Sequence, residues 1–422
     1  MVRVQHEIQG IGMSEIAARY GTPFYVYDGE NIKRHYQRLR KCLPECLEIF
    51  YSLKANPNIS ICALLKSLGA RAEVSSLAEL MCALKAGTDP RNIIFLGPGK
   101  RMEELQACLE HRIYAVVAES LQELELLDKI CAERKSGMRV AIRINPSFEV
   151  KGARLMMGGR PRQFGIDQDQ LEQASAFLAS LKNISIIGFH TYMGTRILDE
   201  EEVAHNTLNI LTMAENLARL LKIELEMVDI GGGLGVPYYD GETSIDPVAL
   251  GERIAPHIQA FHERHPETRI IMELGRYLVA ESGLFVARVL YTKESCGEHF
   301  VITDGGTNCH MAAVGIGSFV KRNFPIRNLS NTAGNEKLTC NITGPLCTPS
   351  DLLAKAVTIP KAEPGDLIGI ENSGAYGPSA SPVFFLSHGY PAEVMVLNGE
   401  VHLIRERDTY SGILDRMRLI PL

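Results

Sequence analysis

Short apolar runs alternate with amphipathic stretches over the first two-thirds of the chain. Runs of β-branched and other apolar residues are typical of buried strands, and apolar residues three or four apart are typical of packed helices. Strand-like runs lie at residues 47–52, 71–75, 93–96, 114–118, 139–144, 184–189, 226–230 and 269–272. Helical patterns lie between them at residues 59–68, 77–86, 102–109, 121–132, 171–181, 200–221 and 247–265. Eight strands alternating with helices predict a (β/α)8 barrel or a doubly wound sheet, and the lack of an obvious edge strand favours the barrel.

The pattern changes near residue 282, after which strand-like runs dominate and Gly and Pro separate them. These runs lie at residues 284–291, 299–304, 339–343, 366–371, 393–397 and 400–404. The strand-like residues 23–27, ahead of the barrel, can join the same sheet. We therefore predict an α/β protein with a (β/α)8 TIM barrel over residues 29–281. A mainly β domain is expected from residues 1–28 and 282–422.

Composition narrows the class of protein. The chain has 422 residues, more than a single core usually holds, and a formal net charge of −6 from 44 basic and 50 acidic residues. Mild acidity without a basic block argues against nucleic acid, and no apolar run is long enough to span a membrane. No signal peptide is evident, so a cytoplasmic protein is expected. The ten cysteines form no CxxC pair, which predicts buried, reduced thiols and no structural zinc.

Candidate chemistry lies at the ends of the predicted strands, where barrel enzymes carry their active sites. Lys54 closes the first strand. Taken alone, it is better explained as a lysine reaching solvent, although a desolvated amine there can bond covalently to a carbonyl. Tyr192 follows the sixth strand and can pack on a flat ligand or in the core.

The last two strands end in glycine and charge. Gly231, Gly232 and Gly233 let backbone N–H groups approach an anion, as phosphate sites require, and are more than a plain turn needs. Glu273, Gly275 and Arg276 follow the eighth strand. The Glu and Arg either pair with each other or divide between a ring nitrogen and a phosphate.

Taken together, these candidate residues indicate a cofactor more specifically than any one of them does. A lysine, a glycine-rich anion site, a Glu–Arg pair and an aromatic platform on one rim fit pyridoxal phosphate as cofactor. In the β domain, Cys347 lies in a tight polar turn, and Tyr376 offers a phenol on a loop.

Motifs in order along the chain resemble the fold-type III pyridoxal-phosphate decarboxylases, the relatives of diaminopimelate, ornithine and arginine decarboxylases. They are TPFYVYD, FYSLKANPN, EVSSLAEL, IIFLGPGK, RINP, FGID, HTYMGT, DIGGGLG, ELGR, GPLCTPSD and NSGAYG, from about residue 22 to about residue 400. The resemblance implies an alanine-racemase-like barrel, a C-terminal β domain and a homodimer with shared active sites.

The resemblance also implies residue roles. Lys54 would bind the cofactor covalently, Glu73 would lie near its ring, and Glu273 would face the pyridine nitrogen. Phosphate ligands would come from Gly231, Gly232, Gly233, Gly275 and Arg276, with Tyr376 closing that site. Cys347 would reach in from the other subunit to return a proton to the substrate carbon.

Two departures from the family pattern bear on the substrate. Tyr192 stands where diaminopimelate and ornithine decarboxylases usually have a histidine over the ring; it can still stack there. Thr348 stands where those enzymes carry Glu or Asp for a distal ammonium, and an unpaired buried ammonium is costly. The chain thus resembles most a subgroup that acts on acylated or carrier-linked amino acids in siderophore and antibiotic pathways. That subgroup includes citryl-diamino acid decarboxylases and the butirosin glutamyl-acyl carrier protein decarboxylase.

The first substrate hypothesis is therefore a citryl-diamino acid such as N-citrylornithine. A glutamyl group on a carrier protein comes second, and diaminopimelate is a further alternative. Substrate contacts are expected from Thr348 and Asp351, and from Arg154, Arg160 and Arg162 if that arginine-rich segment is not merely a solvated lid. Arg322 and Arg327 can serve the same end.

Two alternatives of another class stay open: an amino-acid racemase on the same barrel, and a catalytically inactive regulatory homologue. The decarboxylase-type motif around Cys347 argues against a racemase. Retention of both Lys54 and Cys347 argues against an inactive protein.

Overall fold

The computed structural model describes every residue except 1–5, 148–154, 157–160, 315–321, 333–335 and 422. Its contacts divide the chain into two compact units. The first contains residues 1–32, 237–242 and 279–422, and the second contains residues 33–236 and 243–278. Among the described residues, no helix combines the length and the apolar character that crossing a membrane requires.

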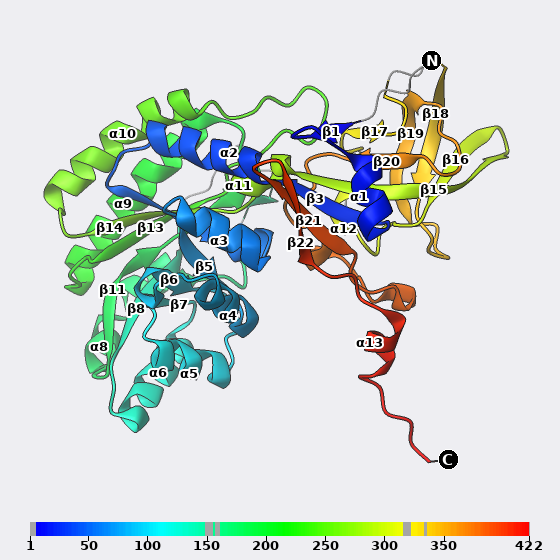
Figure 1. Cartoon of the computed structure of the whole chain (residues 1–422). Helices are drawn as coiled ribbons and strands as arrows, with labels where there is room; N and C mark the ends of the chain where they lie inside the picture. Colours follow the sequence, from blue (N-terminus) through cyan, green and yellow to red (C-terminus); the bar gives the residue numbers. More distant parts are fainter. Residues whose placement is uncertain (1–5, 148–154, 157–160, 315–321, 333–335, 422) are drawn as a thin grey trace. The chain divides into compact units, whose positions relative to one another are not determined.

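The second unit is a closed barrel of parallel strands, as predicted (Figure 1). In spatial order the strands are β8 (Met138–Asn145), β11 (Ile184–His190), β13 (Met227–Gly232), β14 (Arg269–Leu274), β4 (Leu47–Ser52), β5 (Arg71–Val74), β6 (Ile93–Phe95) and β7 (Ala115–Ala118). Parallel pairing of β7 with β8 closes the ring. The short strand β10 (Ile166–Asp167) adds to β8. Closure leaves these strands without a free edge and puts all their carboxyl ends on one rim.

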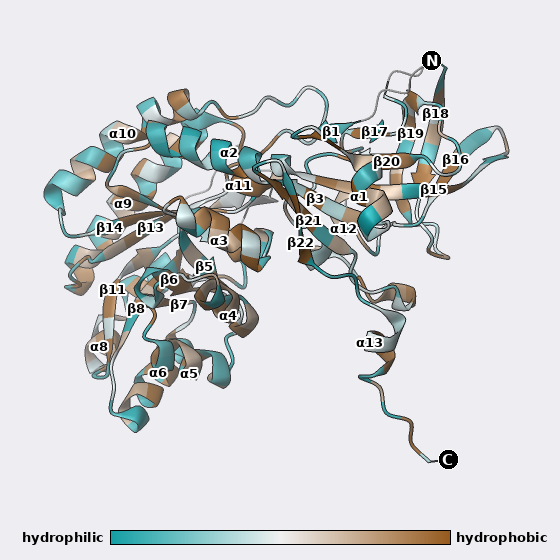
Figure 2. Ribbon diagram, viewed as in Figure 1, coloured by the Kyte–Doolittle hydropathy of each residue, from teal (hydrophilic) through white to brown (hydrophobic). Residues whose placement is uncertain are grey.

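Helices between the strands follow the predicted amphipathic stretches. They are α3 (Ile59–Ser67), α4 (Leu77–Lys85), α5 (Met102–His111), α6 (Leu121–Arg134), α9 (Glu200–Leu221) and α10 (Pro247–Arg264). Ser76 and Ser120 cap α4 and α6 by accepting from backbone N–H groups of the first turn. Hydrophilic and hydrophobic residues alternate along the helices in Figure 2, whereas the barrel strands are mainly hydrophobic.

One predicted helix is wrong. The stretch 171–181 forms two short helices, α7 (Gln168–Glu172) and α8 (Ser175–Ser180). The backbone leaves helical geometry at Ala174, between them. Leu171 and Leu178 are both buried, so the seven-residue spacing of apolar side chains survives the break. A hydrophobic period alone therefore could not reveal it.

The first unit is built around a mixed β-sheet. Its strands run in the order β19 (Leu352–Pro360), β18 (Lys337–Thr343), β16 (Glu298–Thr303), β15 (Gly283–Ser295), β3 (Phe24–Asp28), β21 (Ala392–Leu397) and β22 (Glu400–Arg405). Strand β20 (Leu367–Ile370) pairs with β15 and with β17 (Ile326–Asn328). The early strand β3 joins this sheet, antiparallel to β15 and parallel to β21, as the sequence suggested. Strands β17 and β19 were not predicted from the sequence.

Smaller elements complete the described chain. They are β1 (Glu7–Ile8), β2 (Ile11–Gly12), β9 (Leu155–Met156), β12 (Gly194–Thr195), α1 (Met13–Tyr20), α2 (Gly29–Cys42), α11 (Arg276–Val279), α12 (Met311–Val314) and α13 (Tyr410–Leu414). Each unit has its own apolar core. Phe24, Val286 and Val394 pack in the first unit, and Phe50, Val117 and Ile271 fill the barrel.

Candidate active site

Four predicted site residues lie at the carboxyl ends of barrel strands. Lys54 lies in the 3-10 turn Leu53–Ala55 that follows β4, and Glu73 lies in β5. Tyr192 follows β11, and Glu273 lies in β14. Because all barrel strands are parallel, residues that are far apart in the sequence meet on one rim.

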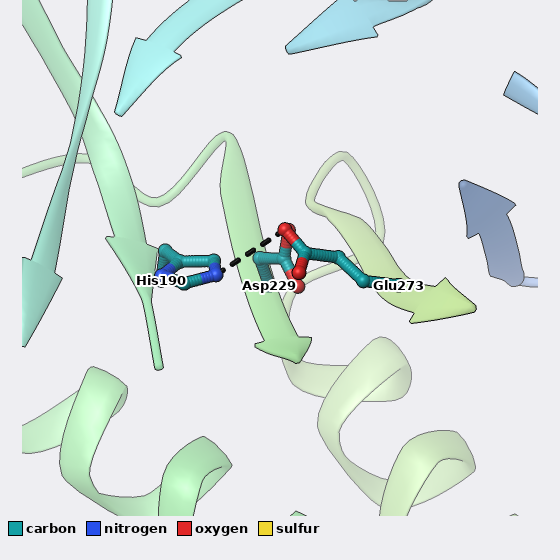
Figure 3. A group of neighbouring side chains, drawn as sticks. All are labelled: His190, Asp229 and Glu273. Atoms are coloured by element: carbon teal, nitrogen blue, oxygen red, sulfur yellow. Dashed lines mark ion pairs between the residues drawn. The ribbon is translucent and has the colours of Figure 1, made fainter. Parts of the chain in front are cut away.

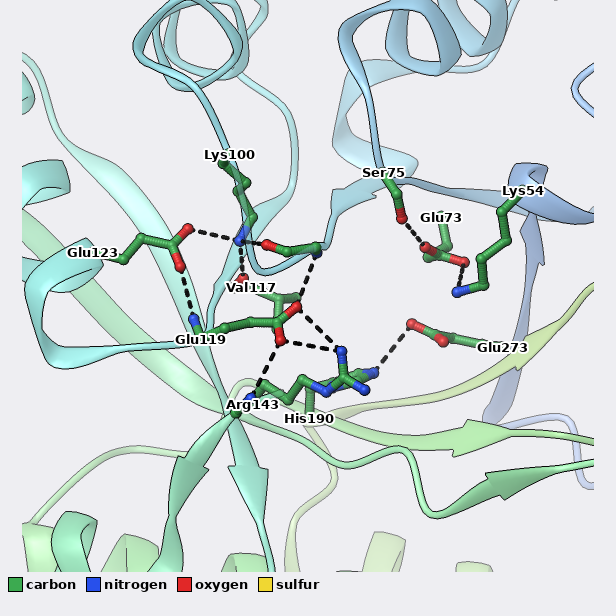
Figure 4. A network of polar contacts seen from close by, with 12 residues as sticks. Lys54, Glu73, Ser75, Lys100, Val117, Glu119, Glu123, Arg143, His190 and Glu273 are labelled. Carbon is green, nitrogen blue, oxygen red and sulfur yellow. Dashed lines mark hydrogen bonds and ion pairs between the residues drawn. The ribbon is translucent and has the colours of Figure 1, made fainter. Parts of the chain in front are cut away.

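Lys54 and Glu73 form an ion pair (Figure 4). The Lys54 Nζ lies 2.9 Å from Oε2 of Glu73, whose carboxylate is buried, while 37% of the Lys54 side chain stays exposed. The Ser75 hydroxyl donates to the other carboxylate oxygen at 2.9 Å. The same Nζ lies 5.7 Å from the ring centroid of Tyr192. The lysine amine is therefore held beside an aromatic face and remains reachable.

A second cluster consists of His190, Asp229 and Glu273 (Figure 3). All three are buried, and His190 Nε2 lies 3.3 Å from Oε1 of Glu273. Both Glu273 oxygens and Oδ2 of Asp229 lack a hydrogen-bond partner among the described residues. Such buried polar atoms are uncommon in a folded protein and favour a ligand that completes them. The donor atoms also lie within 4.8 Å of one another, so this geometry alone is open to a cation as well.

Electrostatics separates the two carboxyl groups. Burial by itself would raise the pKa of Glu273, but the charges of His190 and Lys54 outweigh burial and bring that pKa to about 2. Burial and the Glu273 charge instead raise the pKa of Asp229 well above its usual range. The pair therefore holds one proton, on Asp229, and Glu273 is the anion.

The glycines after β13 have a packing reason of their own. A Cβ on Gly231 would lie 2.5 Å from the Thr191 carbonyl oxygen, and one on Gly232 would lie 1.6 Å from that of Glu273. The backbone of Gly231 also has a positive φ of +68°. Glycine is thus required for the close approach of neighbouring strands, whether or not a phosphate binds. Similar crowding surrounds Gly233 and Gly275, and Arg276 begins α11.

Sequence reasoning missed four buried charged or polar residues on this rim. The sequence left the place of His190 open, and the structure puts it, fully buried, at the end of β11. Sequence reasoning did not single out Asp229, Arg143 or Glu119. A usable signal existed, because Arg143 and Asp229 are charges inside otherwise apolar strands and such charges are rarely buried without a task.

The predicted residues of the β domain lie in the first unit. Cys347 is exposed in the turn between β18 and β19. The buried carboxylate of Asp351 accepts from the backbone N–H groups of Thr307 at 2.6 Å and Leu346 at 2.7 Å, so it organises this turn. Thr348 shares a 2.9 Å hydrogen bond with the Ser350 hydroxyl. Tyr376 adopts a positive φ of +56° on its loop.

Three of the five arginines predicted as substrate contacts lie in the part of the chain that the structure describes. Arg154 and Arg160 lie outside the described residues, and Arg162 is exposed. The Arg322 guanidinium lies 5.1 Å from the Tyr239 ring centroid. Arg327 pairs with Glu371 at 2.6 Å, so its charge is already compensated.

A barrel with buried, incompletely bonded polar atoms at the carboxyl ends of its strands defines a barrel enzyme. Comparison with known proteins specifies the family. Residues 29–280 match the model of the pyridoxal-dependent decarboxylase, pyridoxal binding domain. The chain belongs to this family of pyridoxal-dependent decarboxylases.

Named relatives agree with this membership. The chain is 39% identical over 408 residues to the L-glutamyl-[BtrI acyl-carrier protein] decarboxylase of Niallia circulans, covering 95% of each protein. It is 31% identical over 414 residues to the diaminopimelate decarboxylase of Aquifex aeolicus, covering 97% of this chain and 94% of the relative. The solved diaminopimelate decarboxylase from M. jannaschii, in co-complex with L-lysine, superimposes with a TM-score of 0.89 at 29% identity, covering 99% and 96%. The resemblance seen in the motifs and the predicted fold class are confirmed.

The family identifies pyridoxal phosphate as the cofactor and amino-acid decarboxylation as the class of reaction. The rim residues fit this group. Glu273 is an ionised carboxylate whose oxygens have no hydrogen-bond partner among the described residues, which suits a protonated ring nitrogen. Lys54 supplies a reachable amine within the same group of side chains.

Proposed function

We propose that this chain removes the α-carboxylate of an amino-acid derivative whose distal end is acylated. The observation that carries the substrate class is the turn of residues 344–351, which the structure describes completely. The position after Cys347 holds Thr348, whose hydroxyl bonds to Ser350. The only carboxylate of this turn, on Asp351, already accepts two backbone N–H groups. A substrate with a free distal ammonium would find no available carboxylate in this turn, and burying that charge unpaired is costly.

In this proposal the barrel rim holds the cofactor. Lys54 binds it covalently, and Glu73, fixed by Ser75, orients the lysine amine. Glu273 pairs with the ring nitrogen, Tyr192 stacks on the ring, and phosphate contacts come from Gly231, Gly232, Gly233, Gly275, Arg276 and Tyr376. When bound, pyridoxal phosphate supplies an electron sink for the carbanion left by CO2. An ionised Glu273 supports this role because it favours the protonated ring nitrogen.

Cys347 returns a proton to the substrate carbon after CO2 leaves. Support comes from its exposed side chain on an ordered turn and from the motif it shares with the family. We further propose a homodimer in which each barrel receives Cys347 of the partner subunit. Cys347→Ala should then retain the cofactor while losing product formation.

Among acylated substrates, the 39% identity to a carrier-protein glutamyl decarboxylase supports a carrier-bound glutamyl group. The sequence by itself put a citryl-diamino acid of a siderophore-type pathway first. Both lack a free distal ammonium, so the Thr348 argument applies to either. Exposed Arg162 can contact a substrate carboxylate in both cases.

The test is CO2 release by the purified holoenzyme from four substrates: glutamyl-carrier protein, N-citrylornithine, ornithine and diaminopimelate. Turnover of an acylated substrate should be at least about tenfold above that of both free diamino acids. The reason is that burying one unpaired charge weakens binding by about tenfold or more. Faster turnover of diaminopimelate or ornithine would contradict the proposal.

Diaminopimelate itself is the second candidate, because diaminopimelate decarboxylases are about 31% identical along nearly the whole chain. The variant Thr348→Glu separates the two readings. If the native substrate is acylated, the new carboxylate should raise activity toward diaminopimelate and lower it toward the acylated substrate. Thr348→Val is the control, because it removes the hydroxyl without adding charge.

A further inference from the structure

Glu119 joins three segments of the barrel rim. It follows β7, and only 5% of it is exposed. Its carboxylate accepts from the Gly97 N–H at 3.0 Å, from the Gly165 N–H at 3.2 Å, and from Nη1 of Arg143 at 3.1 and 3.2 Å (Figure 4). One buried carboxylate thus fixes the chain after β6, the chain before β10 and a guanidinium in β8.

A buried lysine holds Glu119 in place. The Lys100 side chain is 1% exposed, and its Nζ donates to the carbonyls of Gly97 and Val117, both at 2.7 Å, and to Glu123 at 2.6 Å. Glu123 in turn accepts from the Glu119 backbone N–H at 2.8 Å. This network orders the carboxylate before any ligand arrives, as supporting shells of functional sites do.

The guanidinium that Glu119 holds acts on Glu273. Arg143 is buried, lies 4.7 Å from the Phe164 ring centroid, and appears beside His190 in Figure 4. Its positive charge is one of those that lower the pKa of Glu273. The two Glu273 oxygens, meanwhile, have no hydrogen-bond partner among the described residues. A guanidinium released from Glu119 would be free to pair with this anion.

We propose that Glu119 is a positioning residue that keeps Arg143 from pairing with Glu273 and so leaves the Glu273 carboxylate available to the cofactor. Through Gly165 it also anchors the end of the segment that carries Arg162. The proposal rests on the function proposed above, in which Glu273 faces the ring nitrogen. It adds that a residue with no cofactor contact sets how tightly the cofactor is held.

The test compares Glu119→Gln with wild-type holoenzyme. Loss of the visible absorbance during dialysis measures dissociation of pyridoxal phosphate, which should be about tenfold faster in the variant, as is common when a supporting hydrogen-bond partner is lost. The matched control is Glu48→Gln, because Glu48 also binds arginines, Arg71 and Arg269, but at the opposite end of the barrel. The control should leave cofactor dissociation unchanged.

A double-mutant cycle separates positioning from general loosening. In a Glu273→Gln background Arg143 has no anion to capture, so Glu119→Gln should change cofactor dissociation by less than about twofold. An equal effect in both backgrounds, or no effect in either, would overturn the proposal. If Glu119→Gln does not fold, Glu119→Asp enters the same cycle, since it keeps the charge and shortens its reach.

Different results would overturn the proposed function and the proposed role of Glu119. A wild-type protein that binds no cofactor through Lys54 would overturn both. A wild-type protein that binds cofactor normally, with unchanged dissociation in Glu119→Gln, would overturn only the role of Glu119.

Discussion

The two ends of the barrel handle charge in opposite ways. At the amino end, Glu48 of β4 accepts from Arg71 at 2.8 Å and from Arg269 at 2.7 Å, and Arg269 lies 4.0 Å from the Tyr114 ring centroid. Arg139 and Glu226 form a further pair there, at 2.6 Å. Opposite charges are matched, and an aromatic face covers a guanidinium.

At the carboxyl end, ion pairs such as Lys54–Glu73 and Arg143–Glu119 surround polar atoms that are left for a ligand. The oxygens of Glu273, Oδ2 of Asp229 and both His190 nitrogens are buried, with no hydrogen-bond partner among the described residues. Buried polar atoms without hydrogen bonds cost stability, so this rim is retained for chemistry and the other for folding. Variants at the two ends should therefore fail differently.

The largest effect is expected for Lys54→Ala. Without its amine the cofactor cannot be held covalently, so CO2 release should fall by at least about a thousandfold, because the covalent route is lost. The visible absorbance of the bound cofactor should change as well. Lys66→Ala, at an exposed lysine of α3, is the control. Unchanged activity in Lys54→Ala would remove the lysine from the site.

Glu273→Gln should lower kcat by about a hundredfold, since a preorganised charge at the reacting group commonly contributes that much. Its melting temperature should change little, because the lost ion pair with His190 is offset by the removal of a buried carboxylate that has no hydrogen-bond partner among the described residues. Since the pKa of Glu273 is about 2, this group should produce no step near neutrality in the wild-type pH profile of kcat. If Glu273→Gln lowered stability without lowering kcat, Glu273 would have a structural role, as Glu48 has at the amino end of the barrel.

Glu48→Ala tests the amino end. It removes the shared acceptor of Arg71 and Arg269, so the free energy of unfolding should fall by about 2 kcal/mol, typical of hydrogen bonds to charged groups. Urea denaturation measures the change, and kcat should stay within twofold, roughly the scatter of a distant site. A catalytic defect with normal stability would contradict the division between the ends.

Glu79 gives the carboxyl end a pH dependence. Burial, helped by the nearby Glu73 charge, raises its pKa to about 7. The folded state therefore keeps a proton that the unfolded chain releases near pH 4.5, and stability should decline as the pH rises from about 4.5 to 7. Glu79→Gln should flatten the melting temperature over that range, whereas Glu48→Gln should not. An identical slope in Glu79→Gln would show that Glu79 does not titrate there.

The smallest effect is expected for Asp229→Asn. Because the raised pKa keeps Asp229 protonated, asparagine is likewise uncharged and keeps the acceptor for the Gly231 N–H, which lies 2.8 Å away in the wild type. Activity should change less than about threefold, since charge is not removed. A loss as large as that of Glu273→Gln would mean that Asp229 is the ionised partner.

Much of the barrel could be predicted because its signal is local. The eight strands that close the barrel are short, mainly apolar runs, and α9 was predicted with its observed bounds, Glu200–Leu221. The break between α7 and α8 was missed because both keep a buried leucine in register. Strands β17 and β19 were missed because exposed residues interrupt β19 and only three residues form β17.

By itself, the sequence determined the strand and helix order, the family and the residue types that carry the chemistry, since these depend on local patterns and motifs. Only the tertiary structure decided which of Glu273 and Asp229 is ionised and that Glu119 holds Arg143. It also decided that the Asp351 carboxylate accepts hydrogen bonds from backbone N–H groups, which leaves it unavailable to a substrate. Those outcomes depend on distances and burial between residues far apart in the chain, which no local pattern contains.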